Sequence, residues 1–263
     1  MFVNCAAAKK IYVYDLSGNF KRSFAHPKDT EYMDVLNYDK DNLICYDASV
    51  YYKDGQSREE GKSYHSLISK KDGSVTRDIY LPYDIIKTPC VHQGDGVAVT
   101  SVRPIIPNRG EWLLVDCSSD TVYNYVPEKN KLVPFFVKAP TKDPEILLTM
   151  GAVTDRYYFL HTVKKEFDFT TGRGFFMNDF MYDKQTNELY KAKVLNSDFV
   201  KKRSVDMFLH PINNNGIAAV QTLSAGQLVE AYQEDGLKGR LKEVAAGLDE
   251  ESNPVVMLVK YKN

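Results

Sequence analysis

Short apolar segments separated by turn residues recur along the chain, and this repetition constrains the fold more than any other feature. Residues 9–24, KKIYVYDLSGNFKRSF, are typical: a β-branched and aromatic segment, a turn around Gly18, and a second such segment. Residues of these types favour strands, and glycine accepts the positive φ of tight turns. Asp-Gly at 72–73 and the Asn-rich stretch 213–216 are further hairpin signals. The sequence therefore predicts an all-β fold.

The expected strands fall into groups of about four, and the groups start roughly 45–65 residues apart, which is a propeller period lengthened by loops. A sandwich or an ordinary barrel also has many short strands, but neither requires them in fours with similar hairpins. In the third group the first strand is either Val97–Val102 or Cys90–His92. The other expected strands are 32–38, 43–46, 64–69, 75–81, 112–117, 121–126, 132–138, 146–153, 156–163, 175–182, 188–194, 205–210 and 217–222.

The C-terminal part interrupts this pattern with an expected helix. A Ser-Ala-Gly-Gln capping box starts at Ser224, apolar residues at helical spacing continue to Leu248, and Gly247 is expected to end the helix. We interpret the apolar stripe as core packed on the sheets rather than as a partner-binding helix. The sequence therefore predicts a helical insert at 224–253 and a closing strand at 255–261.

Composition argues against several classes of protein. The 263 residues include 34 Lys and Arg against 35 Asp and Glu, in interleaved positions, so the basic face of a nucleic-acid-binding protein is not expected. No apolar run approaches the roughly 20 residues that cross a bilayer, and these residues contain no signal peptide.

Four cysteines lie far apart in the sequence, and we interpret them as small buried hydrophobes, with a disulfide as the alternative. They are Cys5, Cys45, Cys90 and Cys117.

Four segments resemble a known family: IYVYDLSGNFKRSF, SSDTVYNYVPEKNKLVPFFVKAP, TDRYYFLHTVKKEFDF and LKGRLKEVAAGLDEESNPVVMLVKYK. Together they resemble bacterial six-bladed β-propeller proteins of the NHL/TolB-like type, over residues 9–262. The resemblance implies a propeller fold. Because many members carry a lipoprotein signal, it also implies a location outside the cytoplasm, in the periplasm or at the cell surface. The shared motifs are structural, so no catalytic residue is carried over. The family's exported N-terminus and opening strands have no counterpart in these residues.

The strands amount to about five blades, whereas the resemblance implies six. We therefore expect an incomplete ring, whose native product extends upstream by one blade and a signal peptide. An open edge would expose unpaired N–H and C=O groups, so the chain is expected to aggregate when expressed alone. The predicted fold is a single β-propeller domain over residues 1–263, of the six-bladed type and incomplete, with a C-terminal helical insert.

Long connections between strands are the expected location of binding, because loops on a rigid scaffold carry most binding residues. The segments 50–63, 164–174 and 224–253 are expected to emerge together on one face, the loop face. Their aromatic residues and arginines resemble interface composition; the alternative is solvated loops with aromatics tucked beneath them. The candidate ligand-binding residues are Tyr51, Tyr52, Arg58, Lys164, Lys165, Phe167 and Arg173.

No catalytic signature of the GxSxG, HExxH or phosphate-loop type occurs in the sequence. His92, His161 and His210 lie near expected strand ends, but their spacing matches no metal-binding motif. We predict no metal, no cofactor and no catalytic residue. The single tryptophan, Trp112, is interpreted as a core residue rather than a ligand anchor.

Two functions of different classes fit this sequence. The favoured one is a non-enzymatic binding or scaffolding propeller that recognises a protein, a peptide or a glycan on its loop face. The alternative is a hydrolase or lyase with its site in the propeller channel. Propellers of both kinds exist, so fold alone does not decide. An enzyme should gather carboxylates or histidines with perturbed pKa values around one site, whereas a binding protein should present an apolar or aromatic patch.

Overall fold

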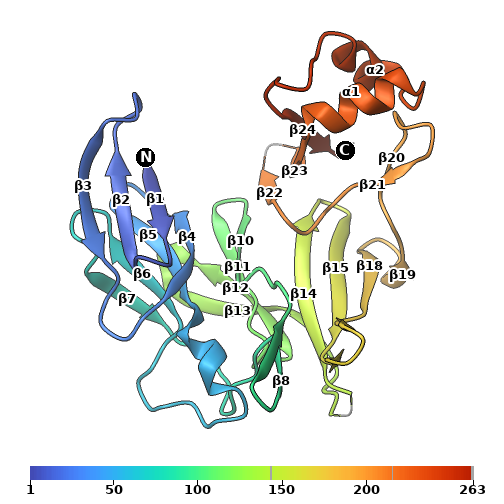
Figure 1. Ribbon diagram of the computed structural model, residues 1–263. Coiled ribbons are helices and arrows are strands. Elements are labelled where there is room, and N and C mark those ends of the chain that lie inside the picture. Colours follow the sequence, from blue (N-terminus) through green and yellow to red (C-terminus); the bar gives the residue numbers. More distant parts are fainter. Residues whose placement is uncertain (143, 215, 262–263) are drawn as a thin grey trace. The chain divides into compact units, whose positions relative to one another are not determined.

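The computed structural model describes residues 1–142, 144–214 and 216–261, and antiparallel strands dominate it (Figure 1). The chain forms two compact units. Unit 1 comprises Met1–Ile105, Leu113–Leu147 and Lys165–Phe175, and unit 2 comprises Ile106–Trp112, Leu148–Lys164 and Phe176–Asn263. The predicted single domain over 1–263 stays a prediction.

Within the described residues, three four-stranded and two three-stranded antiparallel sheets have their strands in chain order. Such meanders are the blades of a propeller, so the predicted fold class with about five blades is confirmed. The three-stranded sheets are β1 (Phe2–Cys5), β2 (Lys10–Tyr14), β3 (Phe20–Ala25), and β22 (Pro211–Asn214), β23 (Ile217–Leu223), β24 (Val255–Lys260). The four-stranded sheets are β4 (Tyr32–Asn37), β5 (Asn42–Asp47), β6 (His65–Ser69), β7 (Val75–Ile79); β10 (Ile105–Asn108), β11 (Glu111–Leu114), β12 (Thr121–Val126), β13 (Lys131–Val137); and β14 (Ile146–Val153), β15 (Tyr157–Lys164), β18 (Met177–Asp183), β19 (Glu188–Lys191).

Smaller elements lie between these sheets. Three two-stranded hairpins and two short 3-10 helices accompany the two α-helices in the described part of the chain. The hairpins are β8 (Cys90–Gln93) with β9 (Gly96–Val99), β16 (Phe167–Asp168) with β17 (Arg173–Gly174), and β20 (Leu195–Asn196) with β21 (Arg203–Ser204). The helices are η1 (Ala48–Lys53), η2 (Pro127–Lys129), α1 (Ala225–Gln233) and α2 (Gly239–Ala245).

Both predicted alternatives for the first strand of the third group were wrong. Residues 97–99 pair with β8 in the β8–β9 hairpin, and the first strand of the four-stranded sheet is β10 instead. Pro104 and Pro107 obscured β10, because proline lacks the N–H that a strand donates. β10 tolerates Pro107 because it is an edge strand of its sheet.

The predicted strand at 205–210 was also wrong. This segment lies outside the strands, and β22 begins only at Pro211. The Asp206 carboxylate accepts hydrogen bonds from the backbone N–H groups of Phe208 and Leu209, at 2.7 and 2.8 Å. Such a local side-chain turn competes with strand pairing for the backbone donors. The turn predicted at 213–216 includes residue 215, which lies outside the described residues.

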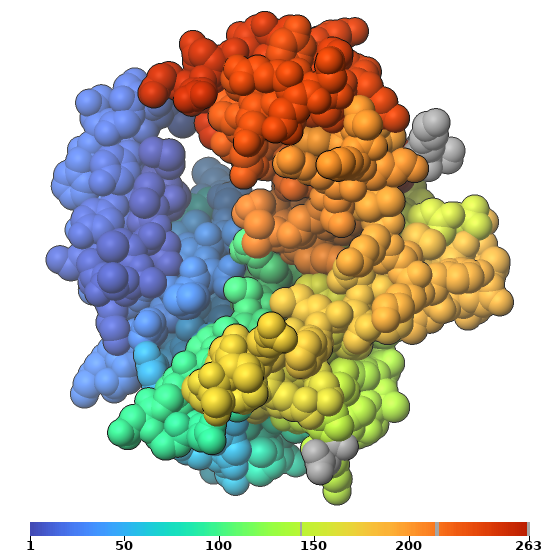
Figure 2. All heavy atoms as spheres, turned by 45° about the vertical axis from the view of Figure 1, so that its right-hand side comes forward, coloured from blue at the N-terminus to red at the C-terminus, as the bar shows by residue number. Residues whose placement is uncertain are grey.

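The C-terminal helical insert is confirmed as two helices, α1 and α2, which Figure 2 shows in red above the orange residues of the same unit. The predicted single helix breaks at Asp235, where φ is 51°. Ser224 is the N-cap residue of α1, but its side chain makes no capping hydrogen bond, so the expected capping box does not form.

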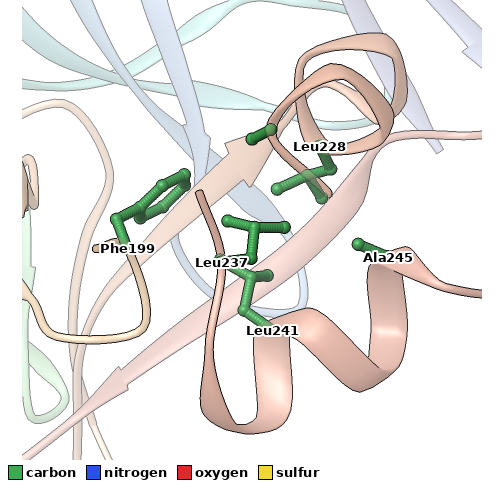
Figure 3. Packing of buried hydrophobic residues seen from close by; sticks show 6 residues of the cluster. Phe199, Leu228, Leu237, Leu241 and Ala245 are labelled. Carbon is green, nitrogen blue, oxygen red and sulfur yellow. The ribbon is translucent and has the colours of Figure 1, made fainter. Parts of the chain in front are cut away.

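Apolar residues pack the two helices against the rest of unit 2 (Figure 3). Leu228 of α1, Leu237 between the helices and Leu241 of α2 form one buried cluster with Phe199. Partly buried residues from β23 and β24 pack against the same cluster. The stripe is therefore core, as predicted.

The interpretation of the cysteines as buried residues holds for Cys45 and Cys90, whereas Cys5 and Cys117 are partly exposed. All four cysteines are free, so the alternative of a disulfide is wrong. Trp112 is 8% exposed and belongs to the core. In the part of the chain that the structure describes, no helix has the length and apolarity to span a bilayer.

His26 links β1 to β4 and should make stability depend on pH. Its Nδ1 accepts the Tyr32 N–H at 3.2 Å, and its Nε2 lies 2.9 Å from Asn4 Oδ1. An accepting Nδ1 requires a neutral ring, and burial lowers the pKa of His26 below its ordinary value of 6.5. The unfolded chain thus binds a proton more readily than the folded one. The contribution of His26 to the free energy of unfolding is therefore complete above about pH 6.5, and it decreases as the pH falls below this value.

We therefore expect the free energy of unfolding to decrease between pH 7.5 and pH 5.5, and less so in His26→Gln. Urea unfolding at several pH values measures both slopes. Equal slopes in the two proteins would show that His26 does not contribute.

Candidate ligand-binding site

An open cavity of about 390 Å³ lies in unit 1, and we call it the insert cavity. It is formed by the residue after η1, by β8, by the segment before β14 and by the start of the 165–175 segment. These are connections and strand ends, where binding residues are expected on a rigid scaffold. Its lining residues are Asp54, Cys90, Val91, His92, Lys142, Pro144, Glu145, Lys165 and Glu166.

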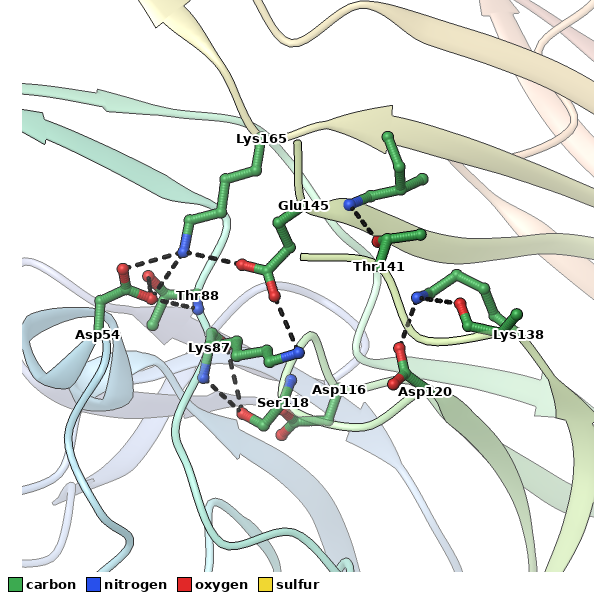
Figure 4. A network of polar contacts seen from close by, with 12 residues as sticks. Asp54, Lys87, Thr88, Asp116, Ser118, Asp120, Lys138, Thr141, Glu145 and Lys165 are labelled. Atoms are coloured by element: carbon green, nitrogen blue, oxygen red, sulfur yellow. Dashed lines mark hydrogen bonds and ion pairs between the residues drawn. The ribbon is translucent and has the colours of Figure 1, made fainter. Parts of the chain in front are cut away.

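A chain of ion pairs joins three lining residues of the insert cavity, Asp54, Lys165 and Glu145, to Lys87 (Figure 4). Lys165 Nζ lies 2.8 Å from Asp54 Oδ1 and 3.6 Å from Glu145 Oε2, and Lys87 Nζ lies 2.9 Å from Glu145 Oε1. Hydrogen bonding to Glu145 raises the pKa of Lys87. Two ammonium groups thus alternate with two carboxylates, which holds their side chains in fixed positions.

Local folding places Asp54 in this chain of ion pairs. η1 begins after Asp47, whose Oδ1 accepts the Ser49 N–H at 3.0 Å as an N-cap. Asp54 follows the helix as its C-cap residue, and its Oδ1 also accepts hydrogen bonds from the N–H and the hydroxyl of Thr88, at 2.7 and 2.9 Å. The carboxylate therefore joins η1, the 87–88 segment and Lys165.

The other end of the ion-pair chain is anchored in the same way. The N–H of Lys87 donates to Ser118 Oγ at 3.1 Å, and Ser118 Oγ donates to the Lys87 carbonyl at 3.2 Å. Asp116 Oδ1 in turn accepts the Ser118 N–H at 2.8 Å. Lys87 is thus fixed by backbone contacts as well as by Glu145.

The chemistry of the lining suits recognition of a polar ligand. Burial raises the pKa of the Cys90 thiol, which keeps it protonated and weakly nucleophilic. Val91 and Pro144 add apolar surface, and His92 and Lys142 are exposed at the rim. Among the described residues, no group of three or more His, Cys, Asp and Glu side chains is placed to hold a metal ion.

Two of the predicted site residues, Lys165 and Arg58, are held in unit 1 by polar contacts. Lys165 lies in the wall of the insert cavity and joins the 50–63 and 164–174 segments through Asp54. Arg58 Nη1 donates to the Leu81 carbonyl at 2.7 Å, and its guanidinium lies 5.0 Å from the centre of the Tyr83 ring. Arg58 therefore supports the loop.

The predicted aromatic residues divide into packed and exposed ones. Tyr51 packs on Tyr46, with ring centres 6.3 Å apart. Phe167 contacts Phe169 and Phe175, at 4.9 and 5.6 Å between ring centres. Tyr52, by contrast, is 76% exposed.

The two remaining candidates lie at the ends of the 164–174 segment. Arg173 is exposed on β17. Lys164 is the last residue of β15 in unit 2, where its N–H donates to the Phe176 carbonyl at 3.0 Å. Phe169 packs so close to Gly96 that a Cβ at residue 96 would lie 2.9 Å from its ring; Figure 2 shows this segment in yellow beside the green β8–β9 residues.

Sequence reasoning missed Asp54, Lys87 and Glu145. Asp54 and Lys165 are 111 positions apart, so no local spacing could indicate the pair. The only available signal was the position of Asp54 within the first long insert.

We expect Lys165→Met to lower the free energy of unfolding by about 1–3 kcal/mol, because the partly buried Asp54 would lose its cation and Glu145 would lose one of two. The Lys165 side chain is 12% exposed and that of Asp54 24%, so some screening by solvent remains. Urea unfolding measures the change, with Lys21→Met as the control, because the Lys21–Asp15 pair is more exposed. A loss equal to that of the control would show that the wall pairs are not stabilising.

Residues 1–218 match the model of a family, DUF5128, described as a 6-bladed beta-propeller. Among solved structures, a protein of Bacteroides fragilis NCTC 9343, named as a predicted exported protein, superposes with a TM-score of 0.58 at 14% identity. The match covers 98% of this chain and 73% of that one, and at this identity it shows the fold alone. The curated proteins contain no match.

Proposed function

Because the chain belongs to the 6-bladed beta-propeller family, we propose that it is a non-enzymatic binding propeller whose ligand, a protein, peptide or glycan, occupies the insert cavity. The observation that carries this proposal is the chain of ion pairs at the cavity wall. Lys87, Glu145, Lys165 and Asp54 neutralise one another and are fixed by further hydrogen bonds. Such a wall is preorganised, which reduces the entropy lost on binding.

We infer that two exposed side chains near Asp54 and Lys165 in the sequence supply contacts to the ligand. Tyr52 lies two residues before Asp54, and Arg173 lies on the segment that begins with Lys165. Tyrosine and arginine are the residue types that most often dominate binding energy. The protonated Cys90 thiol favours binding over nucleophilic catalysis at this cavity.

A location outside the cytoplasm, in the periplasm or at the cell surface, is part of the same proposal. Its support is the name of the structurally similar Bacteroides fragilis protein, which describes export. Assignment to the NHL/TolB-like type within the six-bladed propellers also stays a prediction. Fractionation of cells, with antibody detection of the native protein, tests the location.

We expect the double variant Tyr52→Ala/Arg173→Ala to bind its ligand at least about tenfold more weakly while its melting temperature changes by less than about 2 °C. Both side chains are exposed, so their loss should not affect the core. Wild type is first screened on glycan and peptide arrays, and the affinity for the best ligand is then measured by calorimetry.

Tyr232→Ala/Arg240→Ala in unit 2 is the matched control, since it removes the same two residue types from the helical pair. Equal weakening in control and test variants would contradict the placement of the ligand at the insert cavity. Unchanged affinity in the test variant would contradict it as well.

A further inference from the structure

A second open hollow, of about 610 Å³, lies in unit 1 and shares no residue with the insert cavity. We call it the cationic basin. Four of its lining residues carry a positive charge and one a negative charge, although the whole chain has 34 Lys and Arg against 35 Asp and Glu. The lining residues are Arg22, Lys40, Asp41, Ser69, Lys70 and Lys71.

Contacts between two sheets build this basin. Arg22 of β3 donates from Nε to the Lys71 carbonyl at 3.2 Å and from Nη2 to the Lys70 carbonyl at 2.7 Å. In the same turn Gly73 has a φ of +80°, and a Cβ there would lie 2.3 Å from the Phe24 ring. The β6–β7 turn is therefore seated closely on β3.

Lys70 fixes the third side of the basin. Its Nζ donates to Asn37 Oδ1 at 2.6 Å and to the Asp39 carbonyl, and its N–H donates to the Asp41 carbonyl at 2.7 Å. These bonds hold the β4–β5 turn against the β6–β7 turn. The basin is thus a preformed feature.

The basin keeps an excess of positive charge, although nearby carboxylates offset part of it. Arg22 and Lys70 donate to carbonyl and amide oxygens, which carry no net charge. The carboxylates of Asp39 and Asp72 lie near Lys70 and Lys71, respectively, and offset part of this charge.

Two further cations complete the basin. Lys40 and Lys71 are exposed, and neither forms an ion pair within residues 1–142, 144–214 and 216–261. Positive charges that protein carboxylates leave unpaired attract anions, most strongly at low salt.

We propose that the cationic basin binds an acidic oligosaccharide, a glycan segment carrying sulfate or carboxylate groups. The hollow is much larger than one oxyanion, which favours an extended ligand over free phosphate or sulfate. Asp41 would repel a purely anionic ligand, but its carboxylate accepts hydrogen bonds from sugar hydroxyls.

The test uses a fluorescein-labelled heparin-derived hexasaccharide and fluorescence anisotropy. We expect Lys40→Gln/Lys71→Gln to raise the Kd at least about tenfold and to reduce the slope of log Kd against log salt by about 2, one for each lost contact charge. Lys201→Gln/Lys202→Gln in unit 2 removes the same charge from exposed positions and should change the Kd less than about twofold.

The variant Asp41→Ala distinguishes binding of a glycan from binding of a simple anion. It should strengthen competition by inorganic tripolyphosphate more than it strengthens binding of the hexasaccharide. Both anions gain from the loss of a repulsive charge, but only the hexasaccharide loses an acceptor for its hydroxyls. Absence of hexasaccharide binding to the wild type, or equal weakening by the two lysine variants, would overturn the proposal. Binding of tripolyphosphate as tight as that of the hexasaccharide would overturn the assignment to a glycan.

Discussion

Replacing Gly151 by Ala is expected to lower the free energy of unfolding by about 2–4 kcal/mol, since overpacking a buried site is costly. Gly151 lies in the buried strand β14, and a Cβ there would lie 2.4 Å from the Met207 carbonyl oxygen and 2.5 Å from Phe208 Cδ1. Backbone atoms cannot yield as a flexible side chain can. In addition, the N–H of Ala152 donates to the same carbonyl at 2.7 Å, and this bond would be strained.

Gly247→Ala is the matched control for this prediction. Its Cβ would meet no atom closer than 3.8 Å, so we expect a change below about 0.5 kcal/mol in urea unfolding. If Gly151→Ala proved as stable as the wild type, the 205–210 segment could not lie against β14 as described.

Leu228→Ala should lower the free energy of unfolding by about 2–4 kcal/mol, because truncating a buried leucine removes apolar contacts and leaves a cavity. Leu228 is 1% exposed, at the centre of the cluster that α1 forms with Leu237, Leu241 and Phe199. The helical pair is therefore expected to unfold together with the sheet β22–β24.

Leu258→Ala on β24 is the control for the leucine variant. Its side chain is 48% exposed, so we expect a loss below about 1 kcal/mol in the same urea titration. A loss below 1 kcal/mol for Leu228→Ala as well would contradict the interpretation of the helical pair as core, and it would favour a loosely attached, partner-binding helix.

Much of the fold could be predicted because its signals are local. The Asp-Gly pair at 72–73 indicated the β6–β7 hairpin, and Gly73 indeed has a φ of +80°. Aromatic and β-branched segments between turn residues indicated β15 and β18, which pair in register from Tyr157 with Asp183 to Val163 with Met177. The predictions failed at β10, which contains a proline, and at residues 205–210, where Asp206 forms a side-chain turn. Each feature changes which backbone groups are available for pairing.

The candidate site was less predictable, because its contacts join distant parts of the chain. Lys165 was identified from the length and composition of its insert, but its partners Asp54 and Glu145 came only from the structure. Tyr51 and Phe167 were predicted from the same signal and pack onto other rings, whereas Tyr52 is exposed. Exposure, which decides between these outcomes, depends on packing that local sequence does not specify.

A crystal structure of the protein with its best array ligand other than an acidic glycan, together with the mass of that ligand after prolonged incubation, tests the central claim most directly. We predict that the ligand occupies the insert cavity beside Asp54 and Lys165, contacts Tyr52 or Arg173, and is recovered with its mass unchanged. A ligand bound elsewhere would contradict the assignment of the site. A ligand recovered in cleaved form would contradict a non-enzymatic function and support the hydrolase or lyase alternative.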